Sequence, residues 1–282
     1  MTILVTGASG HLGHLVVERL LARGAAASDI VAGARTPAKA ADLAQRGVRV
    51  VTLDYDQPAT ITAAVQGVDR VLLVSGSEVG RRTAQHTAVI EAAAGVELLV
   101  YTSLYRATES PLPLAAEHVA TEQAIAASGL PATILRNDWY TENYVGDLTR
   151  ARETGEIAAS AGDGRVSSAS RVDYADAAAA VLLGAAHAGK VYELAGDDAW
   201  GYDDLAEAAA EIVGRPVVYR RLTTEEHLAA LEAAGLDAGT AGFVAALDAG
   251  IAQGALESSD RTLSRLIGRP TTPLVEGLRA AL

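Results

Sequence analysis

Three glycines follow the first apolar run of the chain at a spacing that suits phosphate binding. The run Ile3–Thr6 leads directly into Gly7-Ala8-Ser9-Gly10-His11-Leu12-Gly13. Glycines here allow a tight strand-to-helix turn and a close approach of the backbone to a diphosphate, and the helix that follows offers free N–H groups. A glycine-rich turn without a ligand is the alternative. We predict that a dinucleotide is bound by Gly7, Ala8, Ser9, Gly10, His11 and Leu12.

Basic residues follow the second apolar run, at the place where NAD-binding sequences usually carry an acid. Ile30–Ala34 is followed by Arg35, and Lys39 comes one helical turn later. An acid at this position hydrogen-bonds the ribose hydroxyls of NAD, whereas an arginine can hold a 2′-phosphate through two hydrogen bonds. The alternative is a solvated arginine at a helix end. We predict that Arg35 and Lys39 make NADPH the cofactor.

Polar, small or aromatic residues follow the next four apolar runs. Asp54 and Tyr55 follow the third run, where Tyr55 is a natural neighbour for an adenine ring. Ser75-Gly76-Ser77 follows the fourth run and lets the chain pass beneath a cofactor, Thr102 ends the fifth, and Asn137–Tyr140 follows the sixth. Ligands of open parallel sheets lie outside the carboxyl ends of the strands. These segments are therefore expected to form one site, although each alone could be an ordinary loop.

The candidate chemistry is narrowed by what the chain lacks. Neither of its two lysines, Lys39 and Lys190, forms the Tyr-x-x-x-Lys pair with which many reductases protonate a carbonyl oxygen. An electron-poor acceptor such as a quinone stabilises the incoming charge itself, so the enzyme mainly supplies proximity and orientation. His118 is a candidate proton donor to the reduced quinone, with a polar contact or core role as the alternative. Trp139 and Tyr140 are candidates for an aromatic wall, or for simple packing.

The elements that must position these residues alternate along the first half of the chain. Short apolar runs that predict strands are separated by alanine-rich stretches of helical length, and the strands lack polar alternation, as burial on both faces requires. The pattern predicts an α/β fold, a Rossmann-type doubly wound parallel sheet. The expected strands are Ile3–Thr6, Ile30–Ala34, Val48–Leu53, Val71–Val74, Leu98–Thr102 and Thr133–Leu135. The expected helices are Leu12–Ala22, Pro37–Gln45, Ala59–Gln66, Val79–Ala94, Leu114–Ala127 and Thr141–Thr154.

The alternation loosens after Thr154. Glycine-containing turns lead to a helix at Asp173–Ala186 and a strand at Val191–Leu194. The remaining expected elements are helices near Tyr202–Val213, Thr224–Ala234 and Ala238–Gln253 and a strand at Val217–Leu222. We predict an NADP-binding Rossmann domain at residues 1–154. Residues 155–282 are predicted to form a smaller α+β cap that binds the substrate and partly rejoins the sheet.

Composition narrows the classes of partner. The 282 residues carry a net charge of −12, which disfavours nucleic acid and anionic membrane surfaces. The chain has no cysteine, which fits a reducing, cytoplasmic setting. No metal site is expected, because only His11 and His14 stand at a ligand-like spacing, and they lie in the phosphate turn. The acidic surface leaves a homodimer open.

Several motifs together carry a resemblance to a known family. Besides the glycine turn, they are Ser75–Gly80, Tyr101–Leu104 and Arg136-Asn137-Asp138-Trp139-Tyr140-Thr141-Glu142-Asn143-Tyr144. Later motifs are Ala161–Gly164, Arg171–Tyr174, Gly189–Asp197 and Leu266–Thr272. The chain resembles the type-2 NAD(P)H:quinone oxidoreductases, atypical short-chain reductases of the NmrA-like group that are close to triphenylmethane reductase. The resemblance extends over nearly the whole chain.

The resemblance implies an NADPH-dependent quinone reductase that needs no flavin. It implies catalytic or substrate-positioning roles for Asn137, Tyr140 and Asn143 beside His118. It also implies that the cofactor contacts include Asp138, Trp139, Tyr140, Thr141, Glu142, Asn143 and Arg171. The chain departs from the family at Asp138, where a small neutral residue is usual. Because the group also contains sensors that bind dinucleotide without turnover, a non-catalytic redox regulator is the alternative.

Overall fold

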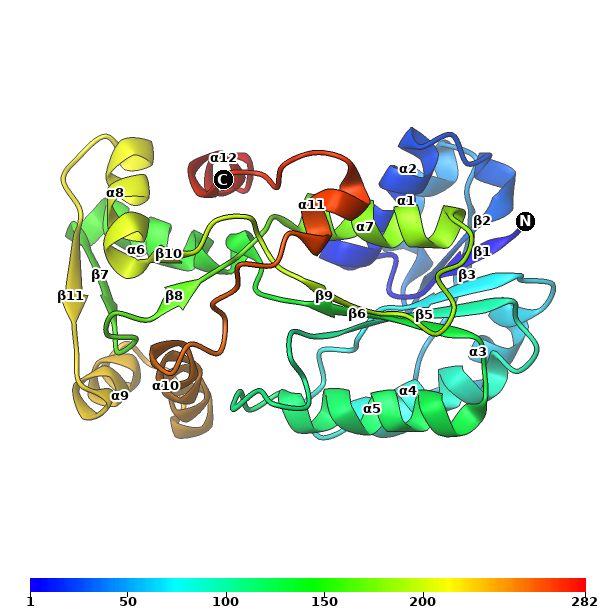
Figure 1. The fold of residues 1–282 in the computed structure, drawn as a ribbon, viewed down its shortest axis with the longest axis horizontal. Coiled ribbons are helices and arrows are strands. Elements are labelled where there is room, and N and C mark those ends of the chain that lie inside the picture. Colours follow the sequence, from blue (N-terminus) through cyan, green and yellow to red (C-terminus); the bar gives the residue numbers. More distant parts are fainter.

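The apolar runs of the sequence form a seven-stranded sheet in a computed structural model of the whole chain, residues 1–282 (Figure 1). Its strand order is β3-β2-β1-β4-β5-β6-β9, and every neighbouring pair is parallel. The strands are β1 (Ile3–Val5), β2 (Ile30–Ala34), β3 (Arg49–Thr52), β4 (Arg70–Leu73), β5 (Leu98–Leu104), β6 (Ala132–Asn137) and β9 (Val191–Leu194). The predicted Rossmann-type doubly wound sheet is confirmed.

Helices cover both faces of the sheet (Figure 1). One face packs against α1 (His11–Ala22), α2 (Ala41–Gln45), α7 (Arg171–Leu183) and α11 (Thr262–Ile267), with short 3₁₀ turns η1 (Ala27–Asp29) and η2 (Pro37–Ala40) alongside. The other face packs against α3 (Pro58–Val65), α4 (Arg82–Ala92) and α5 (Ala115–Ser128). Side chains of β1 alternate between these two cores, since Ile3 and Val5 join the first and Leu4 the second.

A second group of elements lies beside the sheet, on the left of Figure 1. We call residues 145–166, 200–252 and 274–280 the side lobe. It contains α6 (Val145–Thr154), β7 (Glu156–Ala159), β8 (Arg165–Val166), β10 (Trp200–Gly201), α8 (Tyr202–Val213), β11 (Val218–Arg221), α9 (Thr224–Ala233), α10 (Ala238–Ala252) and α12 (Leu274–Ala280). Its core includes Tyr144, Trp200 and Leu256. None of the helices in the chain is long and apolar enough to cross a membrane.

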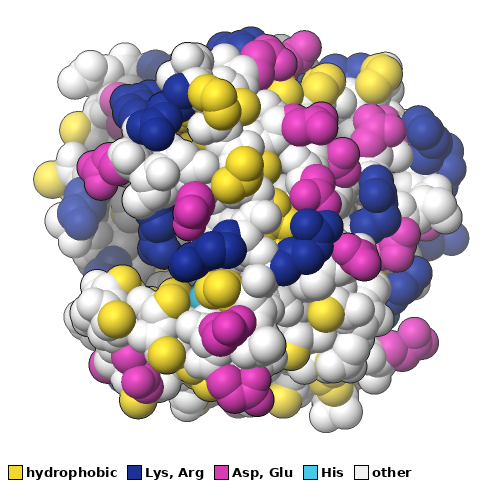
Figure 2. All heavy atoms as spheres, turned by 90° about the vertical axis from the view of Figure 1, so that its left-hand side faces the viewer, with side chains coloured by type: hydrophobic (Ala, Val, Ile, Leu, Met, Phe, Trp, Pro, Cys, Tyr) yellow, Lys and Arg dark blue, Asp and Glu magenta, His cyan; other side chains and the backbone are white.

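Acidic and basic side chains are interspersed on the outer face of the side lobe (Figure 2). Arg220 on β11 pairs with Glu156 on β7 at 3.3 Å, and Arg221 pairs with Asp203 on α8. Exposed pairs of this kind contribute little to stability. Their arrangement gives this face both signs of charge despite the net charge of the chain.

Several helix boundaries differ from the predicted ones for local reasons. The helix expected from Val79 begins at Arg82, because Gly80 adopts a φ of 85°. The stretch expected as one helix from Thr141 starts with a 3₁₀ turn, η3 (Thr141–Tyr144). The helix expected at Asp173–Ala186 spans Arg171–Leu183, because the Ser170 side chain caps it by accepting a hydrogen bond from the Asp173 N–H. The strands β7, β8 and β10 and the helices α11 and α12 were not predicted, since each is too short for a clear period.

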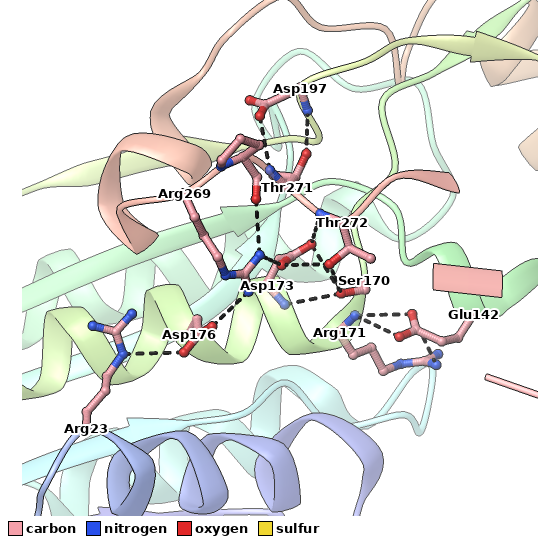
Figure 3. Close-up of polar contacts among 11 residues, drawn as sticks. Arg23, Glu142, Ser170, Arg171, Asp173, Asp176, Asp197, Arg269, Thr271 and Thr272 are labelled. Carbon is pink, nitrogen blue, oxygen red and sulfur yellow. Dashed lines mark hydrogen bonds and ion pairs between the residues drawn. The ribbon is translucent and has the colours of Figure 1, made fainter. Parts of the chain in front are cut away.

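A buried carboxylate ties the C-terminal part of the chain to α7 (Figure 3). The Asp173 side chain is 0% exposed, and the Arg269 guanidinium lies 2.6 Å from it. Asp173 also accepts a hydrogen bond from the Thr272 backbone N–H at 2.8 Å. Arg269 extends to Asp176 at 2.9 Å, which Arg23 of α1 approaches at 3.4 Å. These contacts hold the N-terminus of α7 against α1.

We predict that Arg269→Ala lowers the free energy of unfolding by about 1–3 kcal/mol, because a buried carboxylate loses its cationic donor. The lower part of this range is expected, since Arg269 is itself 40% exposed. Arg265→Ala is the control, because Arg265 is 68% exposed and pairs with Asp260 at the surface. Its cost should stay below about 1 kcal/mol in urea unfolding. Equal losses would contradict the anchoring role of Arg269.

Candidate dinucleotide site

A cavity of about 580 Å³ opens at the carboxyl edge of the sheet. It lies where the strand order reverses between β1 and β4, which is the ligand crevice of open α/β sheets. Most residues predicted for the site line it. They are Gly7, Ser9, Gly10, His11, Leu12, Arg35, Asp54, Tyr55, Ser75, Gly76, Ser77, Thr102, His118, Asn137, Asp138, Trp139, Tyr140, Asn143 and Arg171.

Four residues predicted to bind the cofactor lie outside the cavity lining. Ala8 is buried, and its N–H donates to the Gly33 carbonyl at 2.9 Å. Lys39 is exposed on η2. Thr141 is buried, with its hydroxyl 2.8 Å from that of Ser168. The Glu142 carboxylate accepts a hydrogen bond from the Arg171 backbone N–H at 2.9 Å and so occupies the N-terminus of α7.

The glycine turn has the geometry that a diphosphate requires. Gly7 adopts a φ of 60°, which favours glycine, and a Cβ atom at Gly13 would lie 2.4 Å from the Gly7 carbonyl oxygen. The helix α1 therefore starts in direct contact with the turn. Its N-cap residue, Gly10, offers no side-chain hydrogen bond, so the first N–H groups of α1 stay available to an anion in the cavity.

The ends of β1, β3 and β4 are joined by a ring of hydrogen bonds. The Tyr55 hydroxyl donates to the Val74 carbonyl at 2.7 Å and lies 2.5 Å from the Thr6 hydroxyl, which in turn accepts from the Val74 N–H at 3.0 Å. Burial raises the pKa of Tyr55. Asp54 beside it accepts from the Asp56 N–H and the Gln57 amide, so its carboxylate shapes the local turn. The Tyr55 ring is thus fixed at the wall of the cavity.

Arg35 lies at this same end with an acidic partner. Its guanidinium donates to the Glu78 carboxylate at 3.0 Å, and its side chain is 67% exposed. Glu78 also accepts from Arg81 at 3.0 Å. Because exposed ion pairs of this kind are weak, Arg35 can exchange its carboxylate for a phosphate group of a ligand.

Buried side chains fix the Ser75–Ser77 loop at the bottom of the cavity. The Ser75 N–H donates to the Thr102 hydroxyl at 2.9 Å, and the Gly76 N–H donates to His86 Nε2 at 2.9 Å. His86 Nδ1 lies 2.9 Å from the Thr121 hydroxyl. Burial, aided by the positive charge of Arg82, lowers the pKa of His86 to about 4. The ring is therefore neutral at pH 7, and its Nε2 lone pair accepts the loop N–H.

His118 is buried in a similar network. The Arg82 guanidinium lies 3.3 Å from its Nε2, and because arginine can only donate, Nε2 must accept. Its Nδ1–H then donates to the Tyr101 hydroxyl at 2.8 Å. Burial and the charge of Arg82 lower the pKa of His118 to about 3. This arrangement favours the polar contact over the proton donor among the two interpretations of His118.

The segment after β6 forms the remaining wall together with α7. The Asn137 amide donates to the Tyr140 hydroxyl at 3.4 Å, and the Arg171 guanidinium lies 4.8 Å from the centre of the Tyr140 ring. Arg171 also donates to the Asn143 amide oxygen at 2.9 Å. Figure 3 shows Arg171 beside Glu142, at the α7 end that Asp173 and Arg269 anchor.

Sequence reasoning missed a second group of cavity residues. Glu78, Arg82 and Gln85 all line the cavity, at and just before the start of α4. Their spacing of four and three residues places them on one side of a helix, and this was the available signal. The buried Arg82 also lies 3.9 Å from Glu117 on α5, a contact between two helices that no local pattern indicates.

The fold and the glycine turn define a Rossmann-type dinucleotide-binding protein. A family model described as NAD(P)H-binding matches residues 7–184, and the chain belongs to that family. Quinone oxidoreductase 2 of Escherichia coli K12 is 49% identical over 278 residues, which cover 98% of this chain and 97% of that protein.

Solved structures agree with this assignment. A crystal structure of NADPH-dependent quinone oxidoreductase 2 from Escherichia coli, complexed with NADPH, is 48% identical, with a TM-score of 0.94 and 99% coverage of both chains. The Citrobacter sp. triphenylmethane reductase complexed with NADP(H) is 39% identical, with a TM-score of 0.93 over the full length of both chains. The resemblance inferred from the motifs is confirmed.

We predict that His86 makes the protein sensitive to acid. Its folded pKa of about 4 lies below the ordinary value of 6.5, so the unfolded chain takes up the proton first as pH falls. Between pH 7 and pH 5 the wild type should therefore lose about 2 kcal/mol more unfolding free energy than His86→Gln. Between pH 7 and pH 8 the two proteins should change alike. Parallel losses down to pH 5, measured by urea unfolding, would contradict the neutral state of His86.

Proposed function

We propose that the protein is an NADPH-dependent oxidoreductase that transfers hydride to a quinone or a similar electron-poor acceptor, without a flavin. One observation carries the dinucleotide part, namely the uncapped start of α1 held against the Gly7 turn at the mouth of the cavity. The relatives that bind NADPH and are named quinone oxidoreductases support the reaction.

The residues present fit an NADPH molecule laid across the carboxyl edge of the sheet. Backbone N–H groups of Ser9 to Leu12 would hold the diphosphate. Arg35 would hold the 2′-phosphate, and Tyr55 would flank the adenine. When bound, the reduced nicotinamide supplies the hydride.

The other end of the cavity fits the acceptor. Leu104, Leu114, Trp139 and Tyr140 give it apolar and aromatic walls against which a flat ring can stack while water is excluded. Asn137 and Asn143 would orient the acceptor or the cofactor carboxamide through their amides. We propose that His118 acts by holding Arg82 in place.

Three further points belong to the same proposal. The predicted cap, residues 155–282, would bind the substrate through the part that faces the cavity. The absence of cysteine supports a cytoplasmic location, and a homodimer stays open to measurement.

A direct assay tests the reaction. The purified protein with NADPH and a simple benzoquinone should oxidise the cofactor faster than the uncatalysed rate, followed at the absorbance of the reduced nicotinamide. NADPH binding without any turnover across a panel of quinones, dyes and enones would contradict the enzyme and favour the non-catalytic redox sensor. Failure to bind NADPH would overturn both.

We predict that Arg35→Ala weakens NADPH binding by ~1.5–3 kcal/mol, because a hydrogen bond to a charged group is lost. NADH binding should change much less, since NADH lacks the 2′-phosphate. Lys39→Ala is the matched control, because Lys39 lies outside the cavity lining, and its effect should be smaller. Fluorescence titration with both cofactors checks this, and equal losses for NADPH and NADH would refute the role of Arg35.

A further inference from the structure

A buried carboxyl group without a protein partner lies in the wall of the cavity. Asp138 follows β6 and is 3% exposed, and neither of its side-chain oxygens makes a hydrogen bond. The neighbouring Asn137 also has an unpartnered amide oxygen, and both residues line the cavity. Buried polar groups in native proteins are nearly always paired, because an unpaired one is costly. Two unpaired groups side by side at one cavity wall therefore point to a ligand that meets them.

The surroundings of Asp138 favour the uncharged acid. Burial is the largest influence and raises the pKa of Asp138 well above its usual value. The Trp139 N–H and the Arg106 guanidinium oppose this effect, while Glu193 adds to it. Three tyrosines from other elements also face this carboxyl, namely Tyr105, Tyr144 and Tyr174.

The facing groups are largely engaged elsewhere. Glu193 pairs with Arg136 at 2.8 Å and accepts the Arg106 backbone N–H at 2.8 Å. The Tyr105 hydroxyl donates to Ser258 at 2.8 Å, and the Tyr174 hydroxyl donates to the Trp139 carbonyl. No cation pairs with Asp138 within 4.0 Å, since none of the ion pairs in the structure includes it. A carboxylate there would be both desolvated and unpaired, whereas a carboxylic acid would keep an O–H to donate.

We propose that Asp138 is a neutral carboxylic acid that donates its proton to the oxygen of the reduced acceptor. This inference rests on the proposed quinone reduction. It supplies an acid that the chain otherwise lacks there, because His118 Nε2 accepts a hydrogen bond from Arg82 and no lysine lines the cavity. It also gives a use to the residue at which the chain departs from its family.

The step balances as follows. The quinone takes up a hydride, with its two electrons, from the reduced nicotinamide, which is thereby oxidised. The acceptor is left as a hydroquinone anion. The O–H bond of Asp138 then breaks, a new O–H bond forms on that anion, and the Asp138 carboxylate takes a proton from water after the product leaves. One NADPH, one proton and one quinone give NADP⁺ and one hydroquinone.

Infrared spectroscopy tests the protonation state without any turnover. At pH 7 the wild type should show the C=O stretch of a protonated carboxylic acid, and Asp138→Asn and Asp138→Gly should both lack it. The Gly variant restores the small residue usual in the family, and it serves if the Asn variant does not fold. A wild-type spectrum without this band, or with a band that survives in both variants, overturns the proposal.

Thermal stability gives a second readout that is independent of activity. A raised pKa means that the folded chain holds the proton more tightly than the unfolded chain, so Asp138 costs stability as pH rises through that pKa. The Tm of Asp138→Asn should exceed that of the wild type by a margin that grows between pH 4 and pH 8. A margin independent of pH contradicts the raised pKa.

Kinetics tests the proton transfer itself. With benzoquinone, kcat of Asp138→Asn should fall roughly a hundredfold, and the decline of wild-type kcat at high pH should disappear from the variant. A cationic triphenylmethane dye accepts hydride to give a neutral product, so its reduction needs no proton and should keep its rate. An unchanged quinone kcat, or equal losses with both acceptors, overturns the proton-donor role. If the wild type oxidises no NADPH, the proposed function fails, and the spectroscopic and stability results alone decide the state of Asp138.

Discussion

The start of α1 is pressed against the end of β1, and the site depends on this contact. Because a Cβ atom at Gly13 would overlap the Gly7 carbonyl oxygen, only a glycine pair allows the helix to begin so close to the sheet. The first N–H groups of α1 then face the crevice between β1 and β4. The ring of hydrogen bonds through Tyr55, the His86 contact to Gly76 and the position of Arg171 all shape the cavity around that fixed anion-binding end.

Local signals in the sequence predict one half of this arrangement well. Continuous apolar strands and the glycine spacing are properties of neighbouring residues, so the sheet and the turn follow from them. His86 and Arg82 were missed because their roles arise from contacts between α4 and α5 or the loop beneath the cavity. Arg171 was found only through the resemblance, since α7 packs beside α1 from far along the sequence. The domain boundary at residue 154 stays a prediction, and α7 and β9 beyond it join the sheet and its core.

The arginines of the cavity share a common electrostatic arrangement. Arg35 pairs with Glu78 at 3.0 Å, Arg82 lies 3.9 Å from Glu117, and Arg171 lies 3.7 Å from Glu142. In a chain with a net charge of −12, such pairs keep positive groups at the site without leaving them unbalanced. An anionic ligand must compete with these carboxylates, so its affinity is the difference between two ionic contacts. Discrimination between similar anions can then be sharper than net affinity suggests.

The anchoring of α7 by Arg269 and Thr272 bears on how the protein forms during synthesis. The glycine turn leaves the ribosome early, yet Arg171 depends on partners that are translated about a hundred residues later. A nascent chain that ends before Arg269 therefore has an unfinished crevice, in which Asp173 lacks its cation. Cofactor capture should accordingly be a late, post-translational event, and a ribosome-bound intermediate should expose the apolar side of α7 to chaperones.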